Sequence, residues 1–245
     1  MRKHMMMVLL LVAAVLTALT AQAVGENQNR VDSVQTQAKP KYVFMFIGDG
    51  MSHVQINAAQ ILKGSSEKGN LSLKPLTFTA FPVIGLQTTY DATSFCPDSA
   101  STATSLSSGY KTHSGTIGLG IDKQVVGQTI AEQLKAQKGW KVGLVSTVTL
   151  NHATPAAYYA HVPSRNNYYD IGVQMVESGF DYFGGGAISK AEDGGRTSIY
   201  TLLERAGYLV TDNKQQILNL TSASGKVYAQ NPRLQDSGSM PYAMD

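Results

Sequence analysis

From Lys41 onward, short apolar runs alternate with amphipathic stretches, and this alternation constrains the fold more than any other feature of the chain. Residues 42–47 form a continuous apolar run that fits a strand buried on both faces, and residues 142–145 predict a second buried strand. Shorter runs at residues 180–183 and 208–210 predict two further strands. Because helical stretches separate these runs, the sequence predicts an α/β fold with a mostly parallel sheet flanked by helices.

Start and stop signals delimit the expected helices. We expect Ser52 to cap a helix that runs through Leu62. Asp98 follows a proline and predicts a helix with Ser99 in its first turn and its end at Gly109. The other expected helices span residues 128–138, 155–160, 169–177 and 199–206, and glycines follow three of them, at Gly139, Gly179 and Gly207.

The N-terminus has the three parts of a secretory signal peptide, which we place at residues 1–23. Arg2 and Lys3 precede an apolar run at residues 5–19, and Ala21-Gln22-Ala23 is a small-x-small cleavage site. A transmembrane anchor is the alternative, but the run is short for a bilayer. Residues 24–40 are polar and predict a linker before a globular part at residues 41–245.

The composition and the single cysteine narrow the location and the partners. The signal peptide predicts a secreted protein, and Cys96, the single cysteine, cannot form an intramolecular disulfide. Export without a disulfide indicates the bacterial periplasm, and we expect no stable membrane anchor. The chain is 43% hydrophobic and 15% charged, which is typical of a globular protein. Its formal net charge is +3, two units of which come from the leader, and no Lys/Arg cluster appears elsewhere. This argues against nucleic acid as a partner.

Asp49 follows the first expected strand, in Gly48-Asp49-Gly50. Ligands gather at the carboxyl ends of parallel strands, so a carboxylate there is well placed to hold a metal. The alternative is an Asp that only shapes the turn before the next helix.

Ser99 lies at the start of a helix of small residues, in Asp98-Ser99-Ala100. Free backbone N–H groups and the positive end of the helix dipole favour a phosphoryl group on such a serine. The alternative is a small-residue helix that serves only close packing.

Two later segments add candidates with weaker signals. Asn151-His152-Ala153-Thr154 follows the second expected strand, and His152 and Thr154 can reach a divalent ion; helix capping with a surface imidazole is the alternative. Arg165 can bind phosphate in a bidentate manner or can simply be solvated. The glycines at residues 184–186 can cradle a phosphate, although we favour a turn that needs positive φ.

These segments together resemble the N-terminal part of alkaline phosphatases, in the same order and at similar separations. The matching motifs are Phe46-Ile47-Gly48-Asp49-Gly50-Met51, Asp98-Ser99-Ala100-Ser101-Thr102-Ala103-Thr104, His152-Ala153-Thr154-Pro155-Ala156-Ala157, Ala160-His161-Val162-Pro163-Ser164-Arg165 and Phe183-Gly184-Gly185-Gly186. The resemblance implies a secreted, metal-dependent phosphomonoester hydrolase of the alkaline phosphatase fold that acts through a phosphoserine intermediate.

The resemblance also implies roles for individual residues and a set of cofactors. Ser99 is expected to be the nucleophile and a zinc ligand, and Arg165 the clamp on the phosphate oxygens. Asp49 is expected to lie between one zinc and a magnesium, with Thr154 as a magnesium ligand and His152 in the magnesium shell. The implied cofactors are two Zn²⁺ and one Mg²⁺, the implied substrates are small phosphomonoesters, with inorganic phosphate as product, and the family is often dimeric.

One departure from the family qualifies these expectations. Family members are roughly twice as long, and most of their zinc ligands lie in the second half, whereas this sequence has no His after Arg165. We therefore expect an incomplete, N-terminal portion of an alkaline phosphatase that is inactive alone, or else a phosphate-binding pseudoenzyme. A sulfatase-like relative is a further alternative, but the Arg that such enzymes need soon after Cys-x-Pro does not follow Cys96-Pro97.

Overall fold

The computed structural model describes residues 40–65, 71–124 and 127–234. The chain divides into two compact units, residues 1–47 and residues 48–245. The expected signal peptide and all but the last residue of the expected linker lie outside the described residues. Within the part of the chain that the structure describes, no helix is both long enough and apolar enough to cross a bilayer.

The first expected strand, at residues 42–47, is not formed. This segment has no regular secondary structure, and its side chains are exposed, from 40% for Ile47 to 88% for Phe46. A strand exists only when a neighbouring strand accepts and donates its backbone hydrogen bonds, and none of the four described strands pairs with residues 42–47. The apolar run predicts a buried segment, but a strand also needs a neighbouring strand, which the run itself does not specify.

The second unit contains a four-stranded parallel sheet. Its strands are β1 (Gly143–Val145), β2 (Tyr182–Gly185), β3 (Tyr208–Thr211) and β4 (Lys226–Gln230), in the order β1-β2-β4-β3. Every neighbouring pair is parallel, with Leu144 opposite Phe183 and Phe183 opposite Tyr228. The parallel α/β sheet expected from the sequence is therefore confirmed, although β4, which lies inside the sheet, was not predicted.

The helices lie close to their expected positions, and a few begin or end elsewhere. The full set is α2 (His53–Gly64), α3 (Ser99–Ser108), α4 (Ile130–Lys138), α5 (Ala153–Ala156), α6 (Tyr168–Glu177), α7 (Ile199–Arg205) and α8 (Lys214–Leu218), with short 3-10 helices η1 (Thr77–Ala80) and η2 (Ser222–Ser224). Helix α5 is shorter than expected, and α8 was not predicted. Ser52 caps α2, Asp98 caps α3, and Gly109 and Gly139 end α3 and α4 with positive φ, as the sequence indicated.

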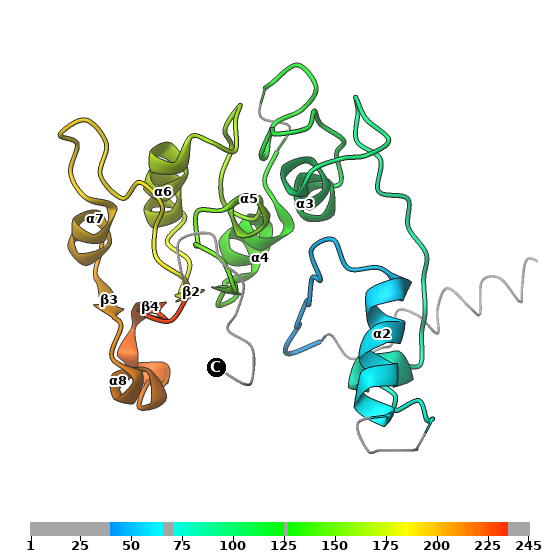
Figure 1. The fold of residues 1–245 in the computed structure, drawn as a ribbon. Helices are drawn as coiled ribbons and strands as arrows, with labels where there is room; N and C mark the ends of the chain where they lie inside the picture. The colour runs from blue at the N-terminus through cyan, green and yellow to red at the C-terminus, as the bar shows by residue number, and fades with distance from the viewer. Residues whose placement is uncertain (1–39, 66–70, 125–126, 235–245) are drawn as a thin grey trace, which may run out of the picture. The chain divides into compact units, whose positions relative to one another are not determined.

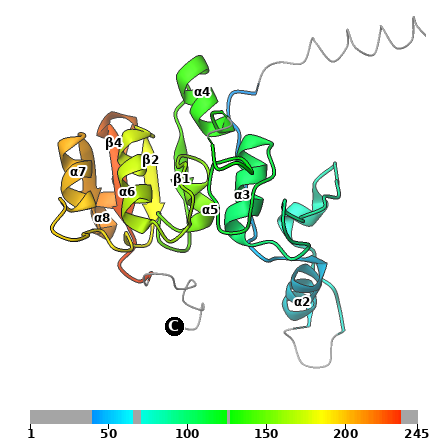
Figure 2. The same ribbon diagram turned by 90° about the horizontal axis from the view of Figure 1, so that it is seen from above.

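Helices cover both faces of this sheet. The chain moves in one direction from β1 to β2 and on to β3, then reverses to place β4 between β2 and β3. Right-handed crossovers put the connections before and after such a reversal on opposite faces. Helices α6 and α7 accordingly pack against each other on one side of the strands, and α8 lies on the other side (Figures 1 and 2).

The core beneath α6 and α7 is aromatic. Phe183 from β2 contacts the rings of Tyr159, Phe180 and Tyr208, with centroid separations of 5.7 to 6.1 Å. Each tyrosine hydroxyl at this level has an acceptor, because Tyr159 Oη donates to the Leu150 carbonyl and Tyr208 Oη to the Phe180 carbonyl. A buried aromatic layer with satisfied hydroxyls fixes the sheet beneath the loops that follow its strands.

Two expectations about the sheet need correction. Strand β1 is not buried on both faces: Leu144 is half-buried, whereas Gly143 and Val145 are exposed, Val145 to 79%. The glycines at residues 184–186 do not adopt positive φ. They permit close backbone contact instead, since a Cβ on Gly185 would lie 2.7 Å from the Ser146 carbonyl oxygen and one on Gly186 would lie 3.0 Å from that of Val148.

His161, treated as structural on sequence grounds, joins two loops to α4. Its Nδ1 lies 2.7 Å from the Gly118 carbonyl oxygen and its Nε2 lies 3.2 Å from Glu132 Oε1. Both partners are acceptors, so both ring nitrogens donate when the imidazole is protonated. The hydrogen bond and charge of Glu132, together with the Gly118 carbonyl, raise the pKa of His161 against the opposing effect of burial.

We expect His161→Gln to lower the free energy of unfolding by about 1.5 kcal/mol at pH 6, and by less at pH 9. The pKa of His161 is raised in the folded state, so its stabilising effect is complete below the unfolded pKa and is lost as pH rises through the folded pKa. Urea denaturation at both pH values measures the difference. His113→Gln is the control, since His113 contacts the Ile121 carbonyl and no acid. An equal loss for His161→Gln at both pH values would contradict the ion pair.

Candidate active site

Asp49 lies at the tip of a tight turn before α2. The Met51 N–H donates to the Gly48 carbonyl at 3.1 Å, and Gly50 adopts a φ of +67°, a conformation that L side chains rarely adopt. Ser52 then begins α2 with a capping box, its Oγ accepting from the Val54 N–H. The turn leaves the Asp49 carboxylate exposed and free to accept hydrogen bonds from elsewhere in the unit.

Ser99 is the first residue of α3, and its hydroxyl contacts Asp49. The Ser99 Oγ donates to Asp49 Oδ1 at 3.1 Å, across 50 positions of sequence. Asp98 caps the helix by accepting the Ser101 N–H, so Ser99 lies in the first turn with its own N–H outside the helical hydrogen-bond pattern. This is the setting that the sequence indicated for a phosphoryl acceptor.

The small residues of α3 serve packing as well as the site. Helix α3 packs against α5, and Ala100, Ala103 and Ala156 are at most 2% exposed. The Ser107 hydroxyl donates to the Ala157 carbonyl between the two elements. The side of α3 is therefore a packing surface, and its first turn carries Ser99, whose role as a phosphoryl acceptor stays a prediction.

Thr154 completes a cluster of three oxygen-bearing side chains around Asp49. The Thr154 Oγ1 donates to Asp49 Oδ2 at 2.9 Å, so the two carboxylate oxygens accept one hydroxyl each. The residues come from the turn before α2, the start of α3 and the start of α5. From the sequence, Asp49 and Thr154 were expected at one edge of the sheet because each follows a predicted parallel strand. The strand at residues 42–47 is not formed, yet the two side chains meet.

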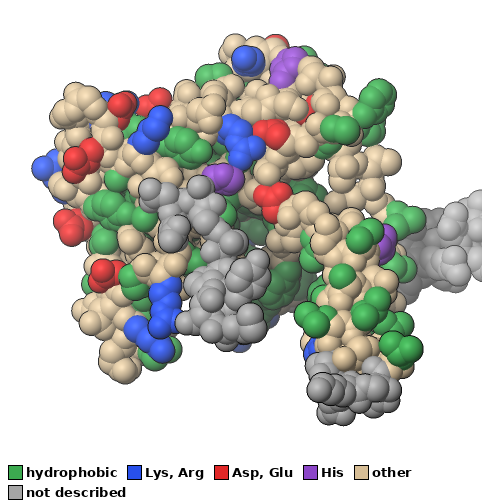
Figure 3. Space-filling view, viewed as in Figure 1, with side chains coloured by type: hydrophobic (Ala, Val, Ile, Leu, Met, Phe, Trp, Pro, Cys, Tyr) green, Lys and Arg blue, Asp and Glu red, His purple; other side chains and the backbone are tan. Residues whose placement is uncertain are grey.

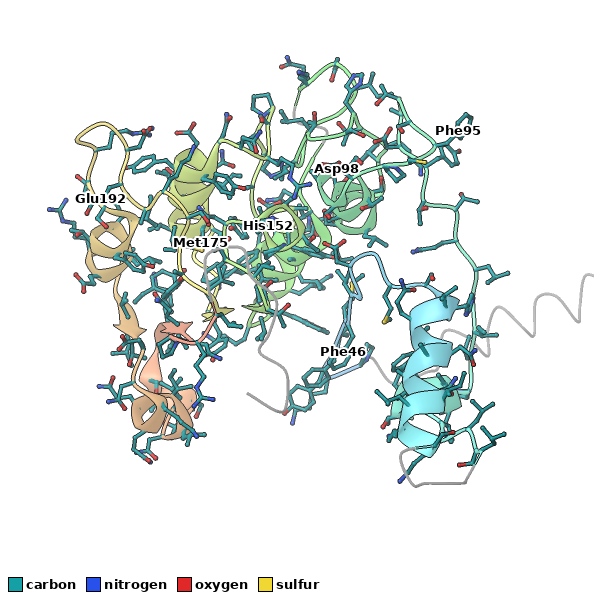
Figure 4. All side chains as sticks on the ribbon, in the orientation of Figure 1. Phe46, Phe95, Asp98, His152, Met175 and Glu192 are labelled. Carbon is teal, nitrogen blue, oxygen red and sulfur yellow. The ribbon has the colours of Figure 1, made fainter. Side chains whose placement is uncertain are left out.

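Arg165 lies beside Asp98 and His152. Its Nη1 donates to Asp98 Oδ2 at 2.8 Å, and its Nη2 lies 3.4 Å from His152 Nε2. Figure 4 labels Asp98 and His152. The side chain is 24% exposed, so the guanidinium is held by neighbours rather than simply solvated. Burial would raise the pKa of Asp98, but hydrogen bonds from Gly115, Ser101 and Arg165 outweigh it and hold that pKa below its ordinary value.

His152 has one ring nitrogen without a partner. Burial, then the charge of Arg165, lower the pKa of His152, while the charge of Asp49 opposes them. A neutral ring whose Nε2 accepts from Arg165 carries its proton on Nδ1, which is buried and has no hydrogen-bond partner among the described residues. Buried polar atoms rarely lack partners in folded proteins. Acidic, basic and histidine side chains lie near one another on the face of the molecule that Figure 3 shows.

The donor atoms fit magnesium better than zinc. One carboxylate and two hydroxyls, from Asp49, Ser99 and Thr154, are hard oxygen ligands of the kind that Mg²⁺ takes. Zinc sites use three or four His, Cys, Asp or Glu side chains, and within residues 40–65, 71–124 and 127–234 no three such side chains lie close enough to share a metal. The described residues thus offer oxygen donors of the kind that Mg²⁺ takes, and among them no cluster of the kind that zinc takes.

Sequence reasoning missed two acids near Ser99. Asp98 was read as a helix start only, yet it is the partner of Arg165. Asp91 was not singled out, yet it is buried and accepts five hydrogen bonds. Its neighbours in sequence, Tyr90 on one side and Ala92, Thr93 and Ser94 on the other, carry no charge pattern, so only the folded loop shows what it contacts.

Comparisons with known proteins place the chain in a family. A family model described as alkaline phosphatase matches residues 40–190. Alkaline phosphatase 4 of Drosophila melanogaster is 39% identical over 161 residues, which cover 63% of this chain and 27% of the relative. The chain thus spans less than a third of the length of the first curated relatives it matches.

Solved structures show the same likeness in three dimensions. The cold-active alkaline phosphatase of Shewanella sp. superimposes with a TM-score of 0.68 and 26% identity, over 81% of this chain and 47% of that one. A His-to-Asp mutant of TAB5 alkaline phosphatase, described with Mg bound in the M3 site, gives 0.60 and 29%, over 76% and 51%. The four-stranded parallel sheet and its helices are a partial alkaline-phosphatase-like fold. The chain belongs to the alkaline phosphatase family.

Proposed function

We propose that this chain is part of a protein that hydrolyses small phosphate monoesters through a phosphoserine formed at Ser99. The observation that carries the proposal is the contact of Ser99 Oγ with Asp49 at the open first turn of α3, with Thr154 on the other carboxylate oxygen. A hydroxyl held at a helix N-terminus beside a metal-binding carboxylate is placed to accept a phosphoryl group.

The residues of the chain divide the work of the reaction. Ser99 Oγ attacks phosphorus, the bond from phosphorus to the ester oxygen breaks, and the proton that Ser99 gives up ends on that oxygen, so that an alcohol departs. Water then attacks the phosphoserine, the serine hydroxyl re-forms with a proton from the water, and inorganic phosphate is released. Arg165 keeps N–H groups beyond those directed at Asp98 and His152, and these bind two phosphate oxygens. The N–H groups at the start of α3 stabilise the charge that the transferring phosphoryl group develops.

The proposed cofactors are two Zn²⁺ and one Mg²⁺. Asp49, Ser99 and Thr154 would hold metal, and the unpartnered Nδ1 of His152 favours a further polar group in the magnesium shell. When bound, such ions lower the pKa of a coordinated hydroxyl or water and neutralise charge on the phosphoryl group. Because the described residues lack a zinc-binding cluster, we expect the 245-residue chain alone to be inactive.

The remaining proposals concern location and assembly. We propose that residues 1–23 direct secretion, into the periplasm of a bacterium, and that no stable membrane anchor or nucleic acid is involved. We also propose that the active protein can form a homodimer, as its family often does. These proposals rest on the sequence and on the family.

The function is tested on the protein as its own gene expresses it, purified from its host (the native gene product). Hydrolysis of p-nitrophenyl phosphate should be abolished by a chelator and restored by Zn²⁺ with Mg²⁺, and inorganic phosphate should inhibit it competitively. Calorimetry with inorganic phosphate distinguishes the enzyme from the alternative, a phosphate-binding pseudoenzyme. If the protein bound phosphate in the presence of a chelator and did not hydrolyse the ester, the alternative would be correct.

Arg165→Ala is expected to raise the inhibition constant of inorganic phosphate about 30-fold, because two charge-assisted hydrogen bonds are lost, while turnover at saturating substrate falls less. Steady-state inhibition kinetics on the native gene product measure this. Arg196→Ala is the matched control, since that guanidinium pairs with Asp170 and Asp193 instead. An unchanged inhibition constant in Arg165→Ala would remove the clamp from the mechanism.

A further inference from the structure

Asp91 is a buried acid that the proposed reaction does not use. It is 4% exposed and lies in the segment that leads to α3. Across the described ranges, no Lys, Arg or His side chain forms an ion pair with it, in contrast to Asp98 and Asp181, which pair with Arg165 and with Lys135 and Lys141. An unpaired buried charge is costly unless hydrogen bonds compensate for it.

Five hydrogen-bond donors surround the Asp91 carboxylate. Oδ1 accepts the Thr93 N–H at 2.7 Å, the Thr93 hydroxyl at 3.1 Å and the Ser94 N–H at 2.6 Å. Oδ2 accepts the Ser101 hydroxyl at 2.9 Å and the Ser114 hydroxyl. Burial alone would raise the pKa of Asp91, but these bonds outweigh it and hold that pKa well below its ordinary value. The five donors therefore favour the ionised form of the Asp91 carboxylate.

One of these donors belongs to the first turn of the Ser99 helix. Ser101 follows Ser99 by two residues and is fully buried. Its hydroxyl lies between two carboxylates, 2.9 Å from Asp91 Oδ2 and 3.0 Å from Asp98 Oδ1. Asp91 thus ties down the turn that presents the Ser99 hydroxyl.

Another donor belongs to the loop that supports Arg165. Ser114 is followed by Gly115, whose N–H donates to Asp98 Oδ1 at 3.0 Å and whose carbonyl accepts the Arg165 N–H at 2.7 Å. The same loop therefore holds Arg165 by its backbone and holds the acid that pairs with its guanidinium. Through Ser114, Asp91 anchors this loop to the start of α3.

We propose that Asp91 is a positioning residue that sets the separation between the Ser99 hydroxyl and the Arg165 guanidinium. This inference rests on the proposed phosphatase function and adds a residue to it. Asp91 touches neither residue directly; it acts through Ser101 on one side and Ser114 on the other. Phosphoryl transfer depends on such separations, because a nucleophile misplaced by about 1 Å can lose on the order of 100-fold in rate.

The test is Asp91→Asn in the native gene product, with kcat, KM and the inhibition constant of phosphate measured beside the unmodified protein. The amide has nearly the shape of the carboxylate, but its NH₂ group faces donors and cannot accept from them. We expect kcat to fall about tenfold and both KM and the phosphate inhibition constant to rise about tenfold. Asp170→Asn, at an exposed acid paired with Arg196, is the matched control.

The comparison of kcat with KM and the phosphate inhibition constant distinguishes a positioning role of Asp91 from a purely structural one. A purely structural role would reduce the number of folded molecules and so the apparent kcat, leaving KM and the inhibition constant of the remaining molecules unchanged. Ser114→Ala, at an exposed residue, removes one donor and should shift the same constants in the same direction if Asp91→Asn fails to fold.

Each outcome is decisive. Unchanged KM and phosphate inhibition in folded Asp91→Asn, or in Ser114→Ala where Asp91→Asn does not fold, would overturn the inference and leave the proposed function intact. An unmodified protein without hydrolysis or phosphate inhibition would instead overturn the proposed function, and this inference with it.

Discussion

Ser99→Ala is expected to lower the phosphomonoesterase turnover of the native gene product by about 10³-fold or more. The substitution removes the oxygen that takes the phosphoryl group, and with it the covalent route that divides the reaction into two easier steps. Residual activity would come from direct attack by water in a site that still binds phosphate. Helix α3 should persist, because its cap is the Asp98 side chain rather than Ser99.

Ser105→Ala on the same helix is the matched control for Ser99→Ala. The Ser105 hydroxyl bonds the Ser101 carbonyl one turn earlier and does not contact Asp49, so its loss should leave turnover within about twofold of the parent value. Steady-state kinetics at saturating substrate measure both variants. Near-parent turnover in Ser99→Ala would remove Ser99 from the mechanism.

Asp49→Asn is expected to have the second largest effect, a loss of about 10²-fold or more in turnover together with a loss of bound metal. Asp49 accepts the hydroxyls of Ser99 and Thr154, so neutralising it weakens the orientation of the nucleophile and removes the charge that attracts a cation to this cluster. Elemental analysis of the purified protein measures metal content, and activity is followed in parallel.

Asp122→Asn is the control for Asp49→Asn, because the Asp122 carboxylate is exposed and accepts the Gln124 N–H within its own turn, its one hydrogen bond in the described part of the chain. It should keep the parent metal content and turnover. If Asp49→Asn also retained the full complement of metal, the assignment of Asp49 as a ligand would be wrong, whatever its activity.

Local signals in the sequence predicted the helices well. Ser52 and Asp98 begin α2 and α3 because their side chains accept backbone N–H groups, and Gly139 ends α4 because it adopts positive φ. These effects operate within a few residues, so they can be read from the sequence. Strands depend on partners far away. None of the four described strands pairs with residues 42–47, whereas β4, a short segment bounded by lysine and glutamine, lies inside the sheet because β2 and β3 pair with it.

The same distinction applies to the site. The order of motifs predicted that Asp49, Ser99 and Thr154 would act together, and their side chains do meet. The partners of Arg165 and His161 were not predicted, because each acid lies tens of residues away in sequence, 67 positions for Asp98 and 29 for Glu132. The glycines at residues 184–186 were expected to form a turn with positive φ, but they allow close backbone contact instead. Both roles require glycine, so the sequence alone does not distinguish them.

The most direct test of the central claim is to locate the phosphoryl group on the protein. The native gene product is incubated with a phosphate monoester, quenched in acid, digested and analysed by mass spectrometry. The account predicts one added phosphoryl group on the peptide that contains Ser99, and none at that position in Ser99→Ala. An active enzyme that carries its phosphoryl group on another residue, or on none, would contradict it.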